Sequence, residues 1–219
     1  MFHLTRTPRE RYNFTQLSTP PLRQYLADVV DYYKLALSSD EPYIKYISFY
    51  HIMEYFYDEV FKKKMISDLR NKITSPDFTY KNDDKVYEIA KFVNNRMRMD
   101  SKSGLGDEAE SLKFVLMEYV PIEELRARIA IIESTAETYY QTSKVGFCNA
   151  PSIAWSDGQA VYTQLCKRIY ATRNSLIHSK SGRKHELYHP YKDEPILRKE
   201  IPLVKAVAEL IIINSSSVL

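Results

Sequence analysis

An arginine and a histidine lie five positions apart in the run Arg173-Asn174-Ser175-Leu176-Ile177-His178. Arginine stays charged at physiological pH and can hold a phosphate through two parallel hydrogen bonds. Histidine, with an unperturbed pKa near 6.5, can move a proton near neutral pH. Together these two residue types can bind a phosphodiester and transfer a proton during its cleavage.

The residues from Val161 to His178 have the periodicity of one long helix. Counted at about 100° per residue from Val161, the apolar side chains fill an arc from 0° to about 180°. Arg173 falls at about 120°, inside that arc, and an arginine directed into an apolar face needs a partner, an interface or a ligand. The polar residues on the opposite side are Lys167, Arg168 and Ser175.

The geometry of a single helix separates the arginine from the histidine. Asn174 and His178 are four positions apart and share a face, but His178 lies about 140° from Arg173. One regular helix therefore does not direct both side chains at the same atom. Two copies packed across a dimer axis bring both pairs into one cleft, and a helix that ends near His178 also relaxes the constraint.

This run resembles the Arg-(polar)-x(3)-His signature of the HEPN (higher eukaryotes and prokaryotes nucleotide-binding) superfamily, at its usual place late in an all-helical domain. The flanks Ile169-Tyr170-Ala171-Thr172 and Ser179-Lys180 are similar to those of HEPN proteins of the bacterial defence and abortive-infection type. The aromatic segment 50–56 resembles an early core helix of those proteins. The resemblance covers residues 22–215.

The resemblance implies a metal-independent endoribonuclease that works as a homodimer, with Arg173 and His178 as the central pair and Asn174 orienting His178 or binding phosphate. RNA carries its own nucleophile, the 2′-hydroxyl, so no cofactor or metal is expected. The products would be a 2′,3′-cyclic phosphate and a 5′-hydroxyl. The resemblance also implies a toxin or antiviral effector with RNA as its substrate and an antitoxin or a sensor protein as a further class of partner.

Three basic residues directly follow the run and are candidates for substrate binding: Lys180, Arg183 and Lys184. Between residues 164 and 192 there are seven lysines and arginines and one glutamate. A basic segment beside the pair would position RNA through phosphate contacts, with salt-dependent affinity. The alternative is a solvated turn.

His51 and Glu54 lie three positions apart on the aromatic helix. They are a possible supporting pair: a second acid and base near the cleft, or, for Glu54, a buried partner of Arg173. The alternative is that both are polar groups satisfied within the core.

Two other function classes stay open. The first is a non-catalytic HEPN module that binds RNA, a nucleotide or a partner protein. The second is a purely structural helical domain in which Arg173 pairs with an internal acid such as Glu54.

Composition limits the kinds of fold and site that this sequence can form. With 5 glycines in 219 residues, a many-stranded β fold is not expected. Cys148 and Cys166 make neither a disulfide framework nor a zinc site and are read as small buried side chains, so a reducing cytoplasm is the expected location. No stretch approaches the roughly 18 to 20 apolar residues of a membrane span.

Hydrophobic periodicity predicts an irregular arm over residues 1–20 and an all-α domain over residues 21–219, a bundle of about six to eight helices. No pair of strands is expected. The aromatic helix is expected to be central and mostly buried. The expected helices span residues 22–37, 42–64, 84–97, 108–119, 121–140, 157–178 and 195–213, with 68–74 as a short helical continuation.

Overall fold

The chain is mostly helical, as the sequence predicts. A computed structural model describes residues 22–102, 106–177 and 187–219, and the expected arm over residues 1–20 lies outside them. The described helices are α1 (Ala27–Ser38), α2 (Pro42–Glu54), α3 (Tyr57–Ile73), α4 (Asp83–Lys102), α5 (Gly106–Tyr119), α6 (Ile122–Ile132), α7 (Ala136–Thr142), α8 (Ala160–Ile177) and α9 (Glu194–Asn214). Two short strands, β1 (Arg23–Gln24) and β2 (Ser217–Val218), complete these elements.

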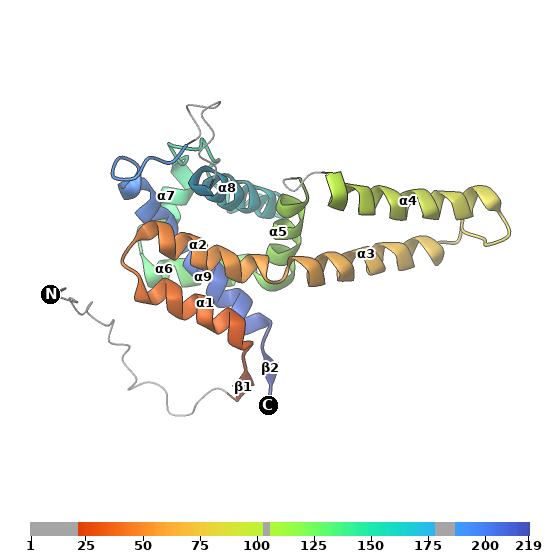
Figure 1. The fold of residues 1–219 in the computed structure, drawn as a ribbon, viewed down its shortest axis with the longest axis horizontal. Coiled ribbons are helices and arrows are strands. Elements are labelled where there is room, and N and C mark those ends of the chain that lie inside the picture. Colours follow the sequence, from red (N-terminus) through yellow and green to blue (C-terminus); the bar gives the residue numbers. More distant parts are fainter. Residues whose placement is uncertain (1–21, 103–105, 178–186) are drawn as a thin grey trace.

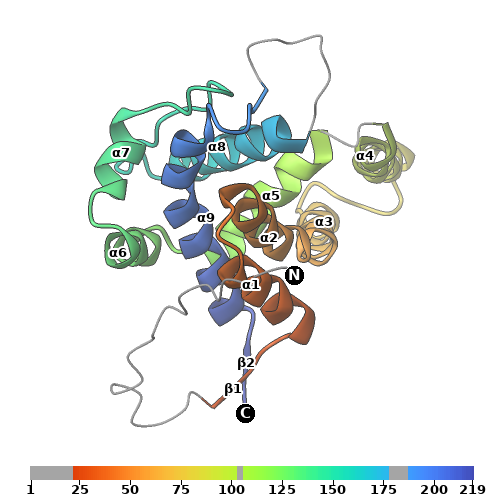
Figure 2. The same cartoon turned by 60° about the vertical axis from the view of Figure 1, so that its left-hand side comes forward.

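Helices α2 and α9 pack against each other at the centre of the body, with α1, α5, α6 and α8 around them (Figures 1 and 2). The apolar residues of α2 run nearly all round the helix, which is typical of a buried helix. The expectation that it is central is confirmed. Its side chains in the core are Tyr46, Phe49, Tyr50, Ile52 and Met53.

The helix expected over residues 42–64 is instead two helices. The chain turns at Tyr55 and Phe56, and the Phe56 ring enters the core beside Tyr119. The second helix, α3, then leaves the body and pairs with α4 in a projecting hairpin (Figure 1). The expected continuation over residues 68–74 belongs to α3. Periodicity alone does not register this turn because no glycine or proline interrupts residues 43–75.

The first helix begins at Ala27 rather than at Leu22. Residues before it are extended and pair with the end of the chain, with Arg23 opposite Val218 and Gln24 opposite Ser217. The expectation of no strand pair is therefore wrong. The partners lie at opposite ends of the sequence, so no local pattern reveals the pairing.

The helix expected over residues 121–140 is also divided, into α6 and α7. At the break, the Glu133 carboxylate accepts hydrogen bonds from the backbone N–H and the hydroxyl of Thr135, a local arrangement that competes with helix. The segment between α7 and α8 has no long helix or strand. It nevertheless packs on the body as predicted, because Phe147, Ile153 and Trp155 are buried.

None of the helices in the described part of the chain combines the length and apolar character that crossing a bilayer requires.

Candidate functional site

Helix α8 carries the arginine of interest, and its buried face differs from the apolar arc of the sequence. Arg168 and Ser175, expected on the polar side, are buried, as is Thr172. At about 100° per residue, the buried face is rotated by about 40° from the expected arc. Lys167 is exposed, as expected. Arg173 is only partly buried, whereas Arg168 is fully buried.

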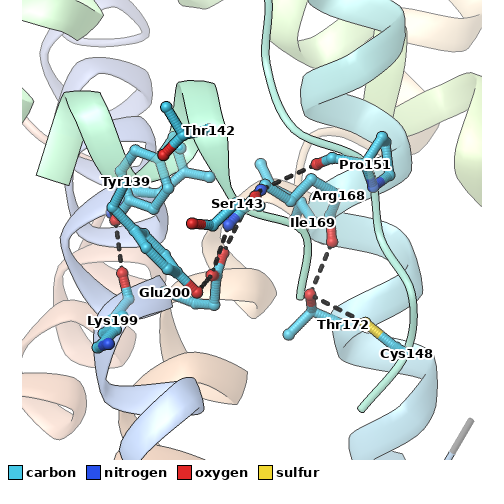
Figure 3. Close-up of polar contacts among 12 residues, drawn as sticks. Tyr139, Thr142, Ser143, Cys148, Pro151, Arg168, Ile169, Thr172, Lys199 and Glu200 are labelled. Carbon is cyan, nitrogen blue, oxygen red and sulfur yellow. Dashed lines mark hydrogen bonds and ion pairs between the residues drawn. The ribbon is translucent and has the colours of Figure 1, made fainter. Parts of the chain in front are cut away.

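Arg168 is fully buried, although the sequence pattern places it on the polar side of its helix. Its guanidinium forms two hydrogen bonds of 2.8 Å with the Glu200 carboxylate of α9. It also donates to the carbonyl oxygens of Ser143 at 2.7 Å and Pro151 at 2.9 Å (Figure 3). Four of its five N–H groups thus have partners. Arg168 connects α8, α9 and the segment after α7.

Two tyrosines complete the surroundings of this pair. The rings of Tyr139 and Tyr140 lie 5.4 and 5.1 Å from the Arg168 guanidinium carbon. The Tyr139 hydroxyl donates to Glu200 at 2.9 Å. Burial, and then the negative charge of Glu200, raises the pKa of both tyrosines, so both stay neutral at physiological pH. This arrangement is complete within the protein and is structural.

A sequence signal for the pair exists in α9. Glu200 lies three, four and seven positions from buried apolar residues, so it occupies the buried face of its helix. A carboxylate in that position requires a buried cation. Those neighbours are Leu197, Leu203, Val204 and Val207.

Arg173 meets side chains from three helices. Its Nη2 lies 3.4 Å from Oε1 of Glu54 in α2, and its Nη1 lies 3.2 Å from Oε2 of Glu108 in α5. The same Nη1 donates to the side-chain oxygen of Asn174 at 3.2 Å. The guanidinium carbon lies 5.1 Å from the ring centre of Tyr50. The ion pair with Glu54 that the sequence analysis considered is present, whereas Glu108 was not foreseen.

The hydrogen bonds of Arg173 are less complete than those of Arg168. Its Nε is buried and has no hydrogen-bond partner among the described residues, and its contacts with carboxylates are single and longer than 3 Å. A buried donor without a partner costs about 1–3 kcal/mol. The Arg173 side chain remains 12% exposed, against 0% for Arg168. Each buried unsatisfied group in a native structure needs an explanation, and a functional role of the residue is one.

Glu54 is held by a second partner besides Arg173. Its Oε2 lies 2.9 Å from Nδ1 of His51, whose ring lies beside the tilted ring of Tyr32 at a centroid distance of 5.1 Å. The hydrogen bond from His51, followed by the charge of Arg173, lowers the pKa of Glu54, although partial burial opposes the shift. An ionised carboxylate only accepts, so Nδ1 carries the proton. His51 is partly exposed rather than enclosed in the core.

Asn174 links Arg173 to Tyr170. It accepts from Arg173 through Oδ1, and its side chain also hydrogen bonds Tyr170, which moderates the rise in the pKa of Tyr170 that burial causes. The amide is therefore fixed beside the guanidinium. This fixed position is what a residue that orients a ligand requires.

The structure brings together four of the predicted site residues: Glu54, His51, Arg173 and Asn174. The others, His178, Lys180, Arg183 and Lys184, lie outside the described residues. Helix α8 ends at Ile177, directly before His178 in the sequence. The chain is next described from Leu187, and the Tyr188 N–H donates to the Ser175 carbonyl at 3.2 Å. Both described ends of the intervening segment thus meet the last turn of α8.

Metal-ligating and thiol groups contribute nothing further to this cluster. Over residues 22–102, 106–177 and 187–219, no group of three or more His, Cys, Asp or Glu could hold a metal ion. Cys148 and Cys166 are free and buried, as expected from the sequence. No protein-family model, curated protein or solved structure matches the chain.

Proposed function

We propose that this protein is a metal-independent endoribonuclease that acts as a homodimer, with Arg173, Asn174 and His178 as its catalytic residues. One observation carries the proposal: Arg173 is a partly exposed arginine with an unsatisfied N–H, fixed beside Asn174 in the last turns of α8, five positions before His178. Its chemistry is that of a phosphate ligand, and the chemistry of a histidine is that of a proton carrier.

In the proposed reaction, the 2′-hydroxyl of RNA attacks the adjacent phosphorus. A bond forms between the 2′ oxygen and phosphorus, the bond from phosphorus to the 5′ oxygen breaks, and the 5′ oxygen takes a proton. The 2′-hydroxyl gives up its proton as it attacks. His178 takes this proton or supplies the one that the 5′ oxygen receives, water exchanges the other, and Arg173 stabilises the charge that develops on the phosphate. Asn174 positions the phosphate or His178.

A dimer is proposed because Arg173 and His178 project about 140° apart on a regular helix. A symmetric interface between two α8 helices would place the Arg173 of one protomer near the His178 of the other. Lys180, Arg183 and Lys184 follow the pair in sequence and are proposed to contact flanking phosphates. A role as a toxin or antiviral effector, with an antitoxin or sensor as partner, rests on the family resemblance.

A second candidate function is a module that binds RNA, a nucleotide or a protein without cleavage. The observation that weighs against cleavage, and that favours a partner protein over a phosphate ligand, is the charge of the cluster: the charges of one guanidinium and two carboxylates sum to −1. An arginine neutralised in this way is a weaker electrostatic catalyst than a free one.

The test is RNA cleavage by the purified chain in excess EDTA, with structured and single-stranded substrates. Wild type is compared with Arg173→Ala, His178→Ala and a matched control, Lys167→Ala, which removes an exposed cation from the same helix. We expect the first two to lose activity about 100-fold or more and the control to retain it, with cyclic phosphate ends in the product. Cleavage that EDTA abolishes, or that His178→Ala retains in full, would contradict the proposal. Binding without cleavage supports the second candidate.

A further inference from the structure

The two carboxylates that contact Arg173 are held in different ways. Glu54 uses one oxygen for Arg173 and the other for His51, and it ends α2, whose preceding residues Ile52 and Met53 are fully buried. Glu108 lies in the first turns of α5. Within the described parts of the chain, its hydrogen-bond partner is Arg173. Displacing Glu54 would leave His51 unpaired, whereas displacing Glu108 breaks a single ion pair.

The Glu108 contact occupies a part of Arg173 that an anion would need. A phosphate binds arginine best through two N–H groups on one edge of the guanidinium. Glu108 takes Nη1 and Glu54 takes Nη2, while Nε is enclosed. With both carboxylates in place the local charge is −1, which opposes the approach of a phosphodiester.

We propose that Glu108 is an internal competitor of the substrate phosphate: it holds Arg173 in the resting chain and gives way when a phosphodiester binds. Glu54 stays in contact and acts as a positioning residue. The inference rests on the proposed function, because it requires Arg173 to bind a phosphate of RNA. Since a phosphate carries the same charge as the carboxylate that it replaces, the exchange keeps the guanidinium neutralised throughout.

The experiment measures the affinity of a fluorescent single-stranded RNA by anisotropy in EDTA, and the kcat and KM of cleavage, for the full chain. The variants are Glu108→Gln, Glu54→Gln and Glu123→Gln. Glu123 is an exposed carboxylate of α6, its side chain 84% accessible, and controls for the general loss of a negative charge. Thermal melting verifies that each variant is folded.

We expect Glu108→Gln to bind RNA about tenfold more tightly and to lower KM, because a neutral amide no longer competes for Arg173. This gain should disappear in the Arg173→Ala background. Glu54→Gln should bring no gain, because Arg173 loses the contact that positions it. Glu123→Gln should change affinity less than twofold.

Unchanged or weaker binding by Glu108→Gln overturns the inference, as does an equal gain in Glu123→Gln or in the Arg173→Ala background. If wild type cleaves RNA and Glu108→Gln gains nothing, the inference fails and the proposed function stands. If wild type shows no activity on RNA but Glu108→Gln binds RNA through Arg173, competition by Glu108 explains why the wild type is inactive. If neither chain binds RNA, both proposals fail.

Discussion

Arg168 of α8 and Glu200 of α9 form an ion pair with two hydrogen bonds of 2.8 Å, and their side chains are 0% and 1% exposed. Desolvation lowers the pKa of the Arg168 guanidinium, but the Glu200 contact outweighs it and leaves that pKa raised. Five residues further along α8, Arg173 makes only single, longer contacts with its carboxylates. Helix α8 thus carries one arginine whose hydrogen bonds the protein supplies, Arg168, and one whose hydrogen bonds are incomplete, Arg173. Changes at the first are expected to affect stability, and changes at the second to affect activity.

The first prediction concerns stability. Arg168→Ala leaves the Glu200 carboxylate buried without a cation, with only the Tyr139 hydroxyl among its described side-chain donors, and should lower the free energy of unfolding by about 3–5 kcal/mol, as should Glu200→Ala for the opposite charge. Urea denaturation followed by circular dichroism measures the change. Lys167→Ala is the control and should stay within about 0.5 kcal/mol of wild type.

The double variant Arg168→Met/Glu200→Leu tests the pairing itself. It removes both charges at once and should be more stable than either single alanine variant, because no buried charge is left alone. A double variant whose loss equals the sum of the two single losses would show that the residues act independently.

Local patterns predicted the helices well but not the points where the chain changes direction. The central place of α2 follows from its apolar residues alone. The turn at Tyr55 and Phe56 depends on a core pocket for Phe56 beside Tyr119, and the pairing of Arg23 with Val218 joins opposite ends of the sequence. Both depend on contacts between segments distant in sequence, which periodicity does not contain.

The same reason explains the outcome for the site. Arg173 interrupts the apolar arc of its helix, which predicts an acidic partner such as Glu54, and both residues lie in the cluster. The periodicity of α8 alone places Arg168 on the polar side of the helix. The Glu200 side chain that makes its burial tolerable lies on α9, and only the packing of the two helices reveals it. Nothing in the local sequence sets Glu108 apart from neighbouring acids such as Glu110, so the pattern does not reveal its contact with Arg173.

A second prediction separates charge from shape at Arg173. Arg173→Lys keeps the positive charge but loses the planar fork that contacts Glu54, Glu108 and Asn174 at once. We expect RNA cleavage to fall about tenfold or more while the chain melts within a few degrees of wild type. Single-turnover cleavage and differential scanning calorimetry measure the two effects. Full activity in the lysine variant would mean that only charge matters at this position.

A third prediction concerns the thiols. Burial raises the pKa of Cys166 to about 11 and also raises the pKa of Cys148. At pH 8, about 0.1% of Cys166 is then thiolate, the reactive form. The thiols of the folded chain should react with 5,5′-dithiobis(2-nitrobenzoate) at least 100-fold more slowly than free cysteine. After unfolding in urea, both thiols should react rapidly. A fast thiol in the folded chain would contradict this burial.

The last prediction follows from the lowered pKa of Glu54, whose usual value is 4.5. A carboxyl with a lower pKa in the folded than in the unfolded chain stabilises the fold when it is ionised. This stabilisation is fully present above the unfolded value and is lost as the pH falls through the folded value. Wild type should therefore be more stable than Glu54→Gln at pH 7, and the difference should shrink below about pH 4.5.

The measurement is the free energy of unfolding of both proteins by urea at intervals from pH 7 to pH 3. Glu123→Gln serves as the control for the loss of a carboxylate, because Glu123 is exposed and its removal should change the stability only slightly. A Glu54→Gln difference that stays constant to pH 3 would mean that the ionised carboxylate does not stabilise the fold. Because His51 and Arg173 both contact this carboxylate, loss of its charge at low pH should also release Arg173 from one partner.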